Sequence, residues 1–386
     1  MATVQLDMDR IIDDRRTRII VCCGSGGVGK TTAAAAIGLR AAERGRQACV
    51  LTVDPARRLA QSMGLTWLDN TPHQVAGVDT SSGGSLHAMM LDMKRTFDEI
   101  VEAHADPDRA AQILANPFYQ SLSSSFAGTQ EYMAMEKLGQ LRHSDEWDLI
   151  VVDTPPSRSA LDFLDAPQRL SRFLDGPLIR VLTGPAKAGM SYMRVLNAGF
   201  AMMTGALTKI IGAQVLKDVQ TFVTALDTMF GGFRERAEWT YRLLQAPGTA
   251  FLVIAAPEPD ALREASYFVE RLDAERMPLA GLILNRVHTS PAGRLSAARS
   301  LAAAETLEMQ DRPNGSETGS RYAIAAAALR MHAERMNLGK RERRLAEHFT
   351  SAHPAIPVAE VVAQPEDVHD LDGLRVIGTT LSQQVP

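Results

Sequence analysis

The stretch Gly24–Thr32 has the residue types and the spacing of a phosphate-binding loop. Its residues Gly24, Ser25, Gly26, Gly27, Val28, Gly29, Lys30, Thr31 and Thr32 satisfy the pattern G-x-x-x-x-G-K-[ST]. Glycines let backbone N–H groups turn inward and approach phosphate oxygens closely. We expect Lys30 to reach the β- and γ-phosphates, Thr31 to ligate Mg²⁺ and Thr32 to donate to a phosphate. This loop therefore predicts binding of a nucleotide tail together with its magnesium ion.

Two aspartates stand where such a loop needs carboxylates. Asp153 follows the apolar run LIVV, and Asp54 follows the run QACVLTV. We expect Asp153 to hold the Mg²⁺ shell through a water molecule, with a turn-capping aspartate as the alternative. Asp54 could orient or deprotonate an attacking water. On the residues alone, an aspartate that caps a helix before Pro55 explains that position equally well.

Seven short β-branched or apolar runs are typical of buried strands. They span residues 17–23, 47–54, 85–93, 147–153, 250–256, 280–287 and 356–362. Continuous rather than alternating apolar runs favour a parallel sheet that is covered on both faces. Helical patterns separate the runs, for example at 31–45 and 259–275. The sequence thus predicts an α/β fold: a doubly wound, mostly parallel sheet with an inserted helical subdomain.

Two long gaps in the strand–helix alternation predict the domain organisation. The nucleotide-binding core is expected over residues 17–94, 146–164 and 248–386, with a helical insert at about 292–350 and a mobile loop at 311–320. Residues 95–145 and 165–247 are expected to form the helical subdomain. Part of it carries Met190, Met193, Met202, Met203 and Met229. Flexible thioethers are typical of adaptable apolar grooves, and ordinary core packing is the alternative.

The composition argues against several other classes of protein and site. A net charge of −4 provides no basic field for nucleic acid. The apolar stretch 195–216 is interrupted by Lys209 and three glycines, so we expect no transmembrane segment. The three cysteines form no CxxC pair and the nine histidines show no metal-ligand spacing. We therefore expect a cytoplasmic protein without a zinc site.

The order of the motifs resembles the ArsA/GET family of P-loop ATPases, whose fold is of the SIMIBI type. GSGGVGKTT resembles the family loop GKGGVGKTT, and TVDPARRLA (52–60) and VVDTPPSRSALDFL (151–164) resemble its two switches. Further resemblances are GTQEYMAMEKL (128–138), APEPDALREA (256–265), LILNRV (282–287) and PVAEVVAQPEDVHDLDGL (357–374). Within the family, the resemblance indicates the actinobacterial branch of ArsA-like ATPases.

The resemblance implies specific roles for individual residues. Asp54 would be the water-activating acid, Glu258 and Asn285 would contact the nucleoside, and Pro365 would lie in the terminal loop near the nucleotide. It also implies ATP or ADP with Mg²⁺, and a dimer that closes on ATP with both nucleotides near the interface. Closure would assemble a hydrophobic groove from the helical subdomains.

Ser25 departs from the family pattern. The family carries a lysine directly after the first glycine of the loop, and this lysine reaches the phosphates of the partner subunit. A serine hydroxyl supplies no full cation to the developing charge. Three explanations are open: slow hydrolysis, a substitute such as Arg57 or Arg58, or a heterodimer with a lysine-bearing paralogue, which we favour.

We expect a Mg²⁺-dependent ATPase that couples ATP binding and hydrolysis to dimer opening and closing. Its client would be a hydrophobic protein segment or an anion, and a partner would mediate any transient contact with a membrane. One alternative is a catalytically weak nucleotide-binding subunit that pairs with a paralogue. Another is the ATPase of an arsenite or anion efflux pump. Cys22, Cys23 and Cys49 do not match the metalloid-binding cysteines of such a pump, and they are expected to be buried on core strands.

Overall fold

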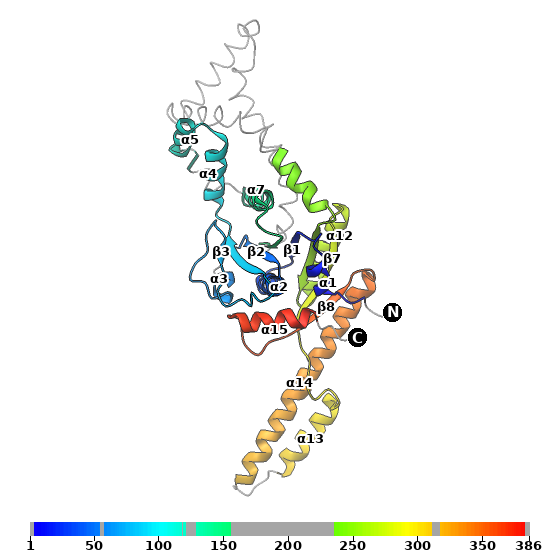
Figure 1. The fold of residues 1–386 in the computed structure, drawn as a ribbon. Coiled ribbons are helices and arrows are strands. Elements are labelled where there is room, and N and C mark those ends of the chain that lie inside the picture. Colours follow the sequence, from blue (N-terminus) through cyan, green and yellow to red (C-terminus); the bar gives the residue numbers. More distant parts are fainter. Residues whose placement is uncertain are drawn as a thin grey trace, which may run out of the picture.

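The computed structural model describes residues 4–54, 58–117, 119–120, 129–155, 235–310 and 317–382. Its centre is an eight-stranded sheet with the order β3-β4-β2-β5-β1-β6-β7-β8 (Figure 1). The strands are β1 (Ile19–Cys23), β2 (Gln47–Thr52), β3 (His73–Gln74), β4 (Ser85–Met90), β5 (Leu149–Asp153), β6 (Thr249–Ala255), β7 (Leu279–Val287) and β8 (Val358–Val362). All neighbouring strands are parallel except β3 and β4.

All seven predicted strands are present, and the expected mostly parallel sheet is confirmed. The eighth strand, β3, has two residues and pairs antiparallel with β4 at the edge of the sheet. So short a strand has no periodic pattern of its own, which is why the sequence did not predict it.

Helices cover both faces of the sheet. They are α1 (Met8–Asp13), α2 (Lys30–Glu43), α3 (Arg58–Ser62), α4 (Met93–His104), α5 (Pro107–Leu114), α7 (Thr129–Ser144), α12 (Pro259–Ala274), α13 (Ala297–Gln310), α14 (Glu317–Ala352) and α15 (Leu371–Ser382). One buried cluster joins the sheet to α1, α2 and α15, and the other joins it to α4, α7 and α12. The sheet is therefore doubly wound, as predicted.

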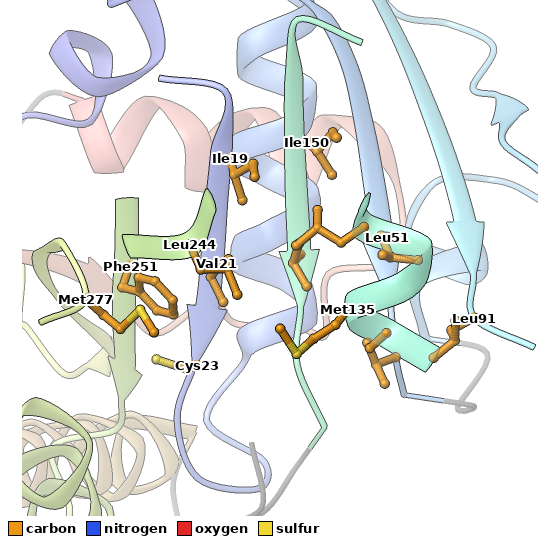
Figure 2. Packing of buried hydrophobic residues seen from close by; sticks show 14 of the residues in the cluster. Ile19, Val21, Cys23, Leu51, Leu91, Met135, Ile150, Leu244, Phe251 and Met277 are labelled. Carbon is orange, nitrogen blue, oxygen red and sulfur yellow. The ribbon is translucent and has the colours of Figure 1, made fainter. Parts of the chain in front are cut away.

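Strand β1 explains why the apolar runs are continuous. Ile19, Val21 and Cys23 belong to one buried cluster, whereas Ile20 and Cys22 belong to the other. In Figure 2, the first three lie among side chains of neighbouring strands and of α7. Because successive residues of a strand point to opposite faces, a strand covered on both sides needs an apolar residue at every position.

Small side chains bring helix α2 close to the sheet. Ala34, Ala35 and Ala36 are fully buried, and a Cβ atom added at Gly38 would lie 2.4 Å from Cγ2 of Val50. A larger residue at Gly38 would push the helix away from β2. This close packing fixes the start of α2 above the carboxyl ends of the strands.

Helices α13 and α14 form a hairpin that projects away from the sheet (Figure 1). The seam between them contains small buried residues: Ser300, Ala304, Ala326 and Ala333. The expected loop over 311–320 is partly wrong, because α14 already begins at Glu317. Residues 311–316 lie outside the described part of the chain.

The predicted helical subdomain, residues 95–145 and 165–247, is described only in part. Helices α5 and α7 lie within 95–145, α4 begins just before this range at Met93, and residues 235–245 are helical. Arg236 joins this last segment to α7 through an ion pair with Glu136 at 2.7 Å. The methionine-bearing segment lies within residues 156–234, outside the described residues, so the division into core and subdomain stays a prediction. None of the helices that the structure describes is both long and apolar enough to cross a bilayer.

Candidate functional site

The carboxyl ends of the parallel strands meet at one edge of the sheet and carry the residues singled out above. The loop Gly24–Thr32 follows β1, Asp153 ends β5, and Asp54 comes two residues after β2. Asn285 lies near the end of β7, while Glu258 and Pro365 each lie three residues past a strand, β6 and β8. In open α/β sheets, this edge is where ligands bind.

Two glycines make the path of the loop possible. A Cβ atom at Gly24 would lie 2.1 Å from the carbonyl oxygen of Ile254 on β6. Gly29 has φ +94°, and a Cβ there would lie 2.2 Å from Nδ2 of Asn285. Only glycine fits either position. Gly29 also caps α2, so the free N–H groups at the positive end of the helix dipole face the loop.

Lys30 is the buried cation of the loop. Its side chain donates from Nζ to the carbonyl oxygen of Ser25 at 2.8 Å, which closes the loop on itself. Burial lowers the pKa of Lys30, while the carboxylates of Asp153 and Asp54 act in the opposite direction. A phosphate at this point would restore the solvation that burial removes from the ammonium group.

Asp153 is fully buried at the end of β5, one strand away from the loop. Its Oδ2 accepts from Oγ1 of Thr31 at 2.8 Å and from Oγ1 of Thr52 at 2.9 Å. Burial raises the pKa of Asp153 to about 6, although these two hydroxyls and Lys30 lower it. The carboxylate is thus costly to ionise in the absence of a cation.

The atoms around Asp153 fit a magnesium ion. Its Oδ1 is buried and has no hydrogen-bond partner among the residues that the structure describes, and the Thr31 hydroxyl donates to the other carboxylate oxygen. Hydroxyl and carboxylate oxygens are ligands that Mg²⁺ prefers, and it usually completes its shell with water and phosphate oxygens. In the described ranges, this site included, His, Cys, Asp and Glu do not gather in groups of three that could bind a metal ion.

Asp54 lies near Asp153 and is linked to it through the hydroxyl of Thr52. The backbone N–H of Asp54 donates to Oγ1 of Thr52 at 3.2 Å. Residues 55–57, including Arg57, lie outside the described part, and Arg58 is exposed at the start of α3. The arrangement brings two carboxylates near the Lys30 ammonium, and the catalytic and metal-binding roles of Asp54, Asp153 and Lys30 stay predictions.

Asn285 approaches the loop from the opposite side. Its Nδ2 donates to the carbonyl oxygen of Val28 at 2.8 Å. The next residue, Arg286, has φ +61° where the register between β7 and β8 shifts. Bulges of this kind change the direction of a side chain, and they are common beside functional sites. Asn285 therefore supports the loop, which the sequence alone did not reveal.

Glu258 and Pro365 are exposed at the same edge. Among the described residues, neither side chain forms a hydrogen bond or an ion pair with the loop, so their roles toward a nucleoside stay predictions. Ser25, Gly26 and Gly27 are partly or fully exposed, which leaves this part of the loop accessible.

The three cysteines are buried and unpaired, as predicted. Burial raises the pKa of Cys23 and of Cys49 to about 12, and it also raises the pKa of Cys22 well above its usual value. Because thiolates are the metal-binding form, these three residues are poor ligands for a metalloid.

Two threonines at the site were missed by sequence reasoning. Thr52 contacts Asp153, and the Thr154 hydroxyl donates to the carbonyl oxygen of Cys22 at 2.9 Å, which ties the segment after β5 to β1. Thr52 is the first residue of the stretch TVDPARRLA, but the resemblance of that stretch assigns it no role. Its contact follows from the pairing of β2 with β5, which places Thr52 beside Asp153.

Comparisons with known proteins agree with this geometry. Residues 17–309 match the family described as anion-transporting ATPase. The chain is similar to ATPase GET3 of Malassezia globosa, with 28% identity over 167 residues, or 43% of this chain and 47% of that protein. It is 22% identical to ATPase GET3 of Ajellomyces dermatitidis over 72% of this chain and 76% of that one. ATPase ARSA2 of Chlamydomonas reinhardtii is also 22% identical, over 72% of this chain and 70% of that protein.

The family match spans more than half of the chain and includes the phosphate loop, both aspartates and Asn285. The predicted family is thereby confirmed: the chain belongs to the anion-transporting ATPase (ArsA) family.

Proposed function

We propose that this chain is a Mg²⁺-dependent ATPase. The observation that carries the proposal is the buried carboxylate of Asp153 beside a glycine loop closed by Lys30. This carboxylate accepts from Thr31, and within the described ranges its Oδ1 has no hydrogen-bond partner. Such an arrangement provides one place for a triphosphate and one for its cation. The names of the similar proteins, which are ATPases, support it.

The loop would bind the phosphates through its backbone. N–H groups of Gly24–Thr32 and the start of α2 provide donors and a positive dipole end, and Lys30 would move from the carbonyl of Ser25 to the β- and γ-phosphates. Thr31 and Asp153 would hold Mg²⁺, Asp153 through water. When bound, the ion supplies charge neutralisation for the phosphate oxygens.

Asp54 would position the attacking water. It lies close enough to Asp153 and Lys30 for its charge to influence the pKa of both. A carboxylate at this place can accept a proton from a water that faces the γ-phosphate. The nucleoside would contact Asn285, Glu258 and Pro365, and Asn285 would recognise the adenine base.

Two substitutions test the assignment. Lys30→Ala should abolish ATP binding, because residues 24–32 of the loop then carry no cationic side chain. Asp54→Asn should preserve ATP affinity and lower kcat by about 10²–10⁴, the usual loss when a general base is removed. Isothermal titration with Mg-ATP and a phosphate-release assay measure the two effects.

Lys137→Ala provides a matched control for the lysine. Lys137 is 8% exposed, close to the 6% of Lys30, but pairs with Glu99 on α4 instead of facing the loop. Its removal should cost stability without changing ATP affinity. Wild-type ATP affinity in Lys30→Ala, or unchanged turnover in Asp54→Asn, would contradict the respective role.

We further propose that the chain works as a dimer, with a lysine-bearing paralogue as its partner. Ser25 supports this pairing. At this position of the loop the chain has a hydroxyl, whereas the ArsA/GET pattern has a lysine whose cation acts across the dimer. ATP would close the dimer, and hydrolysis would open it. The alternative that the same residue favours is a catalytically weak nucleotide-binding subunit that pairs with such a paralogue. A homodimer is the other candidate for the assembly.

The client would be a hydrophobic protein segment or an anion. The proposed location is the cytoplasm, with transient membrane contact through a partner, and the proposed branch of the family is the actinobacterial one. An arsenite pump is disfavoured by the burial of all three cysteines. Copurification with Asp54→Asn in ATP, followed by mass spectrometry, would identify the client.

A further inference from the structure

Thr52 occupies the last position of β2, and its hydroxyl joins the two acidic residues of the site. The side chain is buried and donates from Oγ1 to Oδ2 of Asp153 at 2.9 Å. The same oxygen accepts from the backbone N–H of Asp54 at 3.2 Å. Thr52 and Asp153 are direct register partners of β2 and β5, so the sheet itself fixes the first contact.

The single proton of the hydroxyl has two acceptors within reach. These are Oδ2 of Asp153 at 2.9 Å and the carbonyl oxygen of Asp54 at 3.5 Å. An ionised carboxylate forms the stronger, charge-assisted bond. The proton therefore goes to Asp153, and the lone pairs of the oxygen face the N–H of Asp54. The charge on one acid thus orients the backbone that carries the other.

This contact holds the chain at the point where β2 ends. The ladder between β2 and β5 continues to the N–H of Val53, which donates to the carbonyl oxygen of Asp153 at 3.0 Å. Asp54 follows directly and is tied back by the Thr52 hydroxyl. Displacement of a catalytic group by about 1 Å can cost about 10²-fold in rate, so this tie is placed where small shifts matter.

We propose that Thr52 is a positioning residue: its hydroxyl couples Asp153 to Asp54 and aims the Asp54 carboxylate for hydrolysis. This inference rests on the proposed ATPase function and adds a residue to which neither a motif nor the family resemblance assigns a role. A purely structural hydroxyl would change stability and binding together. A positioning hydroxyl changes kcat while ATP affinity is retained.

Three variants test the proposal in the full chain. Thr52→Val keeps the shape and removes the hydroxyl, and we expect kcat to fall by about 10- to 100-fold with the Kd for Mg-ATP within about threefold. Thr52→Ser keeps the hydroxyl and should retain kcat within about threefold. In the background of Asp54→Asn, Thr52→Val should cause no further loss, because both changes act through one carboxylate.

A second readout does not depend on turnover. Hydrogen exchange of the segment 52–60, followed by mass spectrometry without nucleotide, should be faster in Thr52→Val than in wild type or Thr52→Ser, because the Asp54 N–H loses its acceptor. Thr249→Val is the matched control. Thr249 is also a buried strand threonine, but it lies at the amino end of β6, away from the phosphate loop. Its hydroxyl donates to the carbonyl oxygen of Leu243, so kcat should not change.

The outcomes separate this inference from the proposed function. If Asp54→Asn lowers kcat while Thr52→Val does not, the coupling is wrong and the ATPase assignment stands. Equal losses in Thr52→Val and Thr52→Ser, or effects that multiply with Asp54→Asn, would also overturn the coupling. If Asp54→Asn itself has no effect, the proposed catalytic role fails first.

Discussion

The carboxylate of Asp153 carries a free-energy cost that a ligand can remove. Burial raises the pKa of Asp153 from 3.8 to about 6, so ionising this carboxyl costs more free energy in the folded protein than in the unfolded chain. The unfolded chain ionises the same group at lower pH. For a raised carboxyl pKa, stability from this group is present below about pH 4 and is lost as the pH rises to about 6.

Asp153→Asn should remove this pH dependence from the nucleotide-free protein. The amide has the same shape and no charge, so the variant gains stability relative to wild type as the pH rises. Between about pH 4.5 and 7.5 the difference in unfolding free energy should grow by about 2 kcal/mol. Urea unfolding with a chelator present measures it. Parallel curves for the two proteins over this range would show that Asp153 is not costly to ionise.

At the scale of elements, one arginine connects α1 with the amino ends of the strands. Arg46 is 1% exposed. Its guanidinium donates to the carbonyl oxygens of Ile12, Thr17 and Asp148, each at 2.6 Å, and to Oδ1 of Asp148 at 2.7 Å. This group satisfies backbone carbonyls at the end of α1, before β1 and before β5, on the side of the sheet opposite the phosphate loop.

Arg46→Lys should destabilise the protein although the charge is kept. An ammonium cannot reproduce the planar set of donors, so buried carbonyls lose their partners, and we expect a loss of about 3 kcal/mol. Arg16→Lys, at an exposed arginine that pairs with Asp14, should have little effect. Thermal unfolding compares the two. Similar melting temperatures for both variants would contradict the anchoring role, and ATP affinity should be unchanged in both.

At the scale of the whole molecule, we propose that a partner subunit supplies the cation that the loop lacks. With Ser25 in place of a cation, the chain alone should turn over ATP slowly, and a lysine-bearing paralogue should raise the rate by about 10²-fold or more. Titration of the partner into a phosphate-release assay measures this. The control is a partner whose lysine after the first loop glycine is replaced by alanine. A chain that is as fast alone as in the mixture would need no such partner.

Local patterns predicted most of the fold and part of the site. The order of strands and helices, the loop with Lys30 and Thr31, and the positions of Asp54 and Asp153 at strand ends all follow from short stretches of sequence. The contact between Thr52 and Asp153 does not, because it depends on which strands are neighbours and in which register. The same holds for Asn285, whose bond to Val28 joins residues 257 positions apart.

In the helical hairpin of α13 and α14, local composition predicted the wrong secondary structure for a short stretch. Residues 317–320 have the composition of a loop, yet they form the first turn of α14, a helix of 36 residues. Once a helix is nucleated and packed, each added residue costs little, so a few weak helix formers at its start can be carried along. The loop-like composition therefore predicts that the helix begins after residue 320, whereas α14 begins at Glu317.

The most direct test of the account is a crystal structure of the Asp54→Asn variant with Mg-ATP. We predict the triphosphate against the backbone N–H groups of Gly24–Thr32, with the Lys30 ammonium on the β- and γ-phosphates and the metal ion between the Thr31 hydroxyl and the side of Asp153. An empty loop with the nucleotide bound elsewhere on the protein would contradict it.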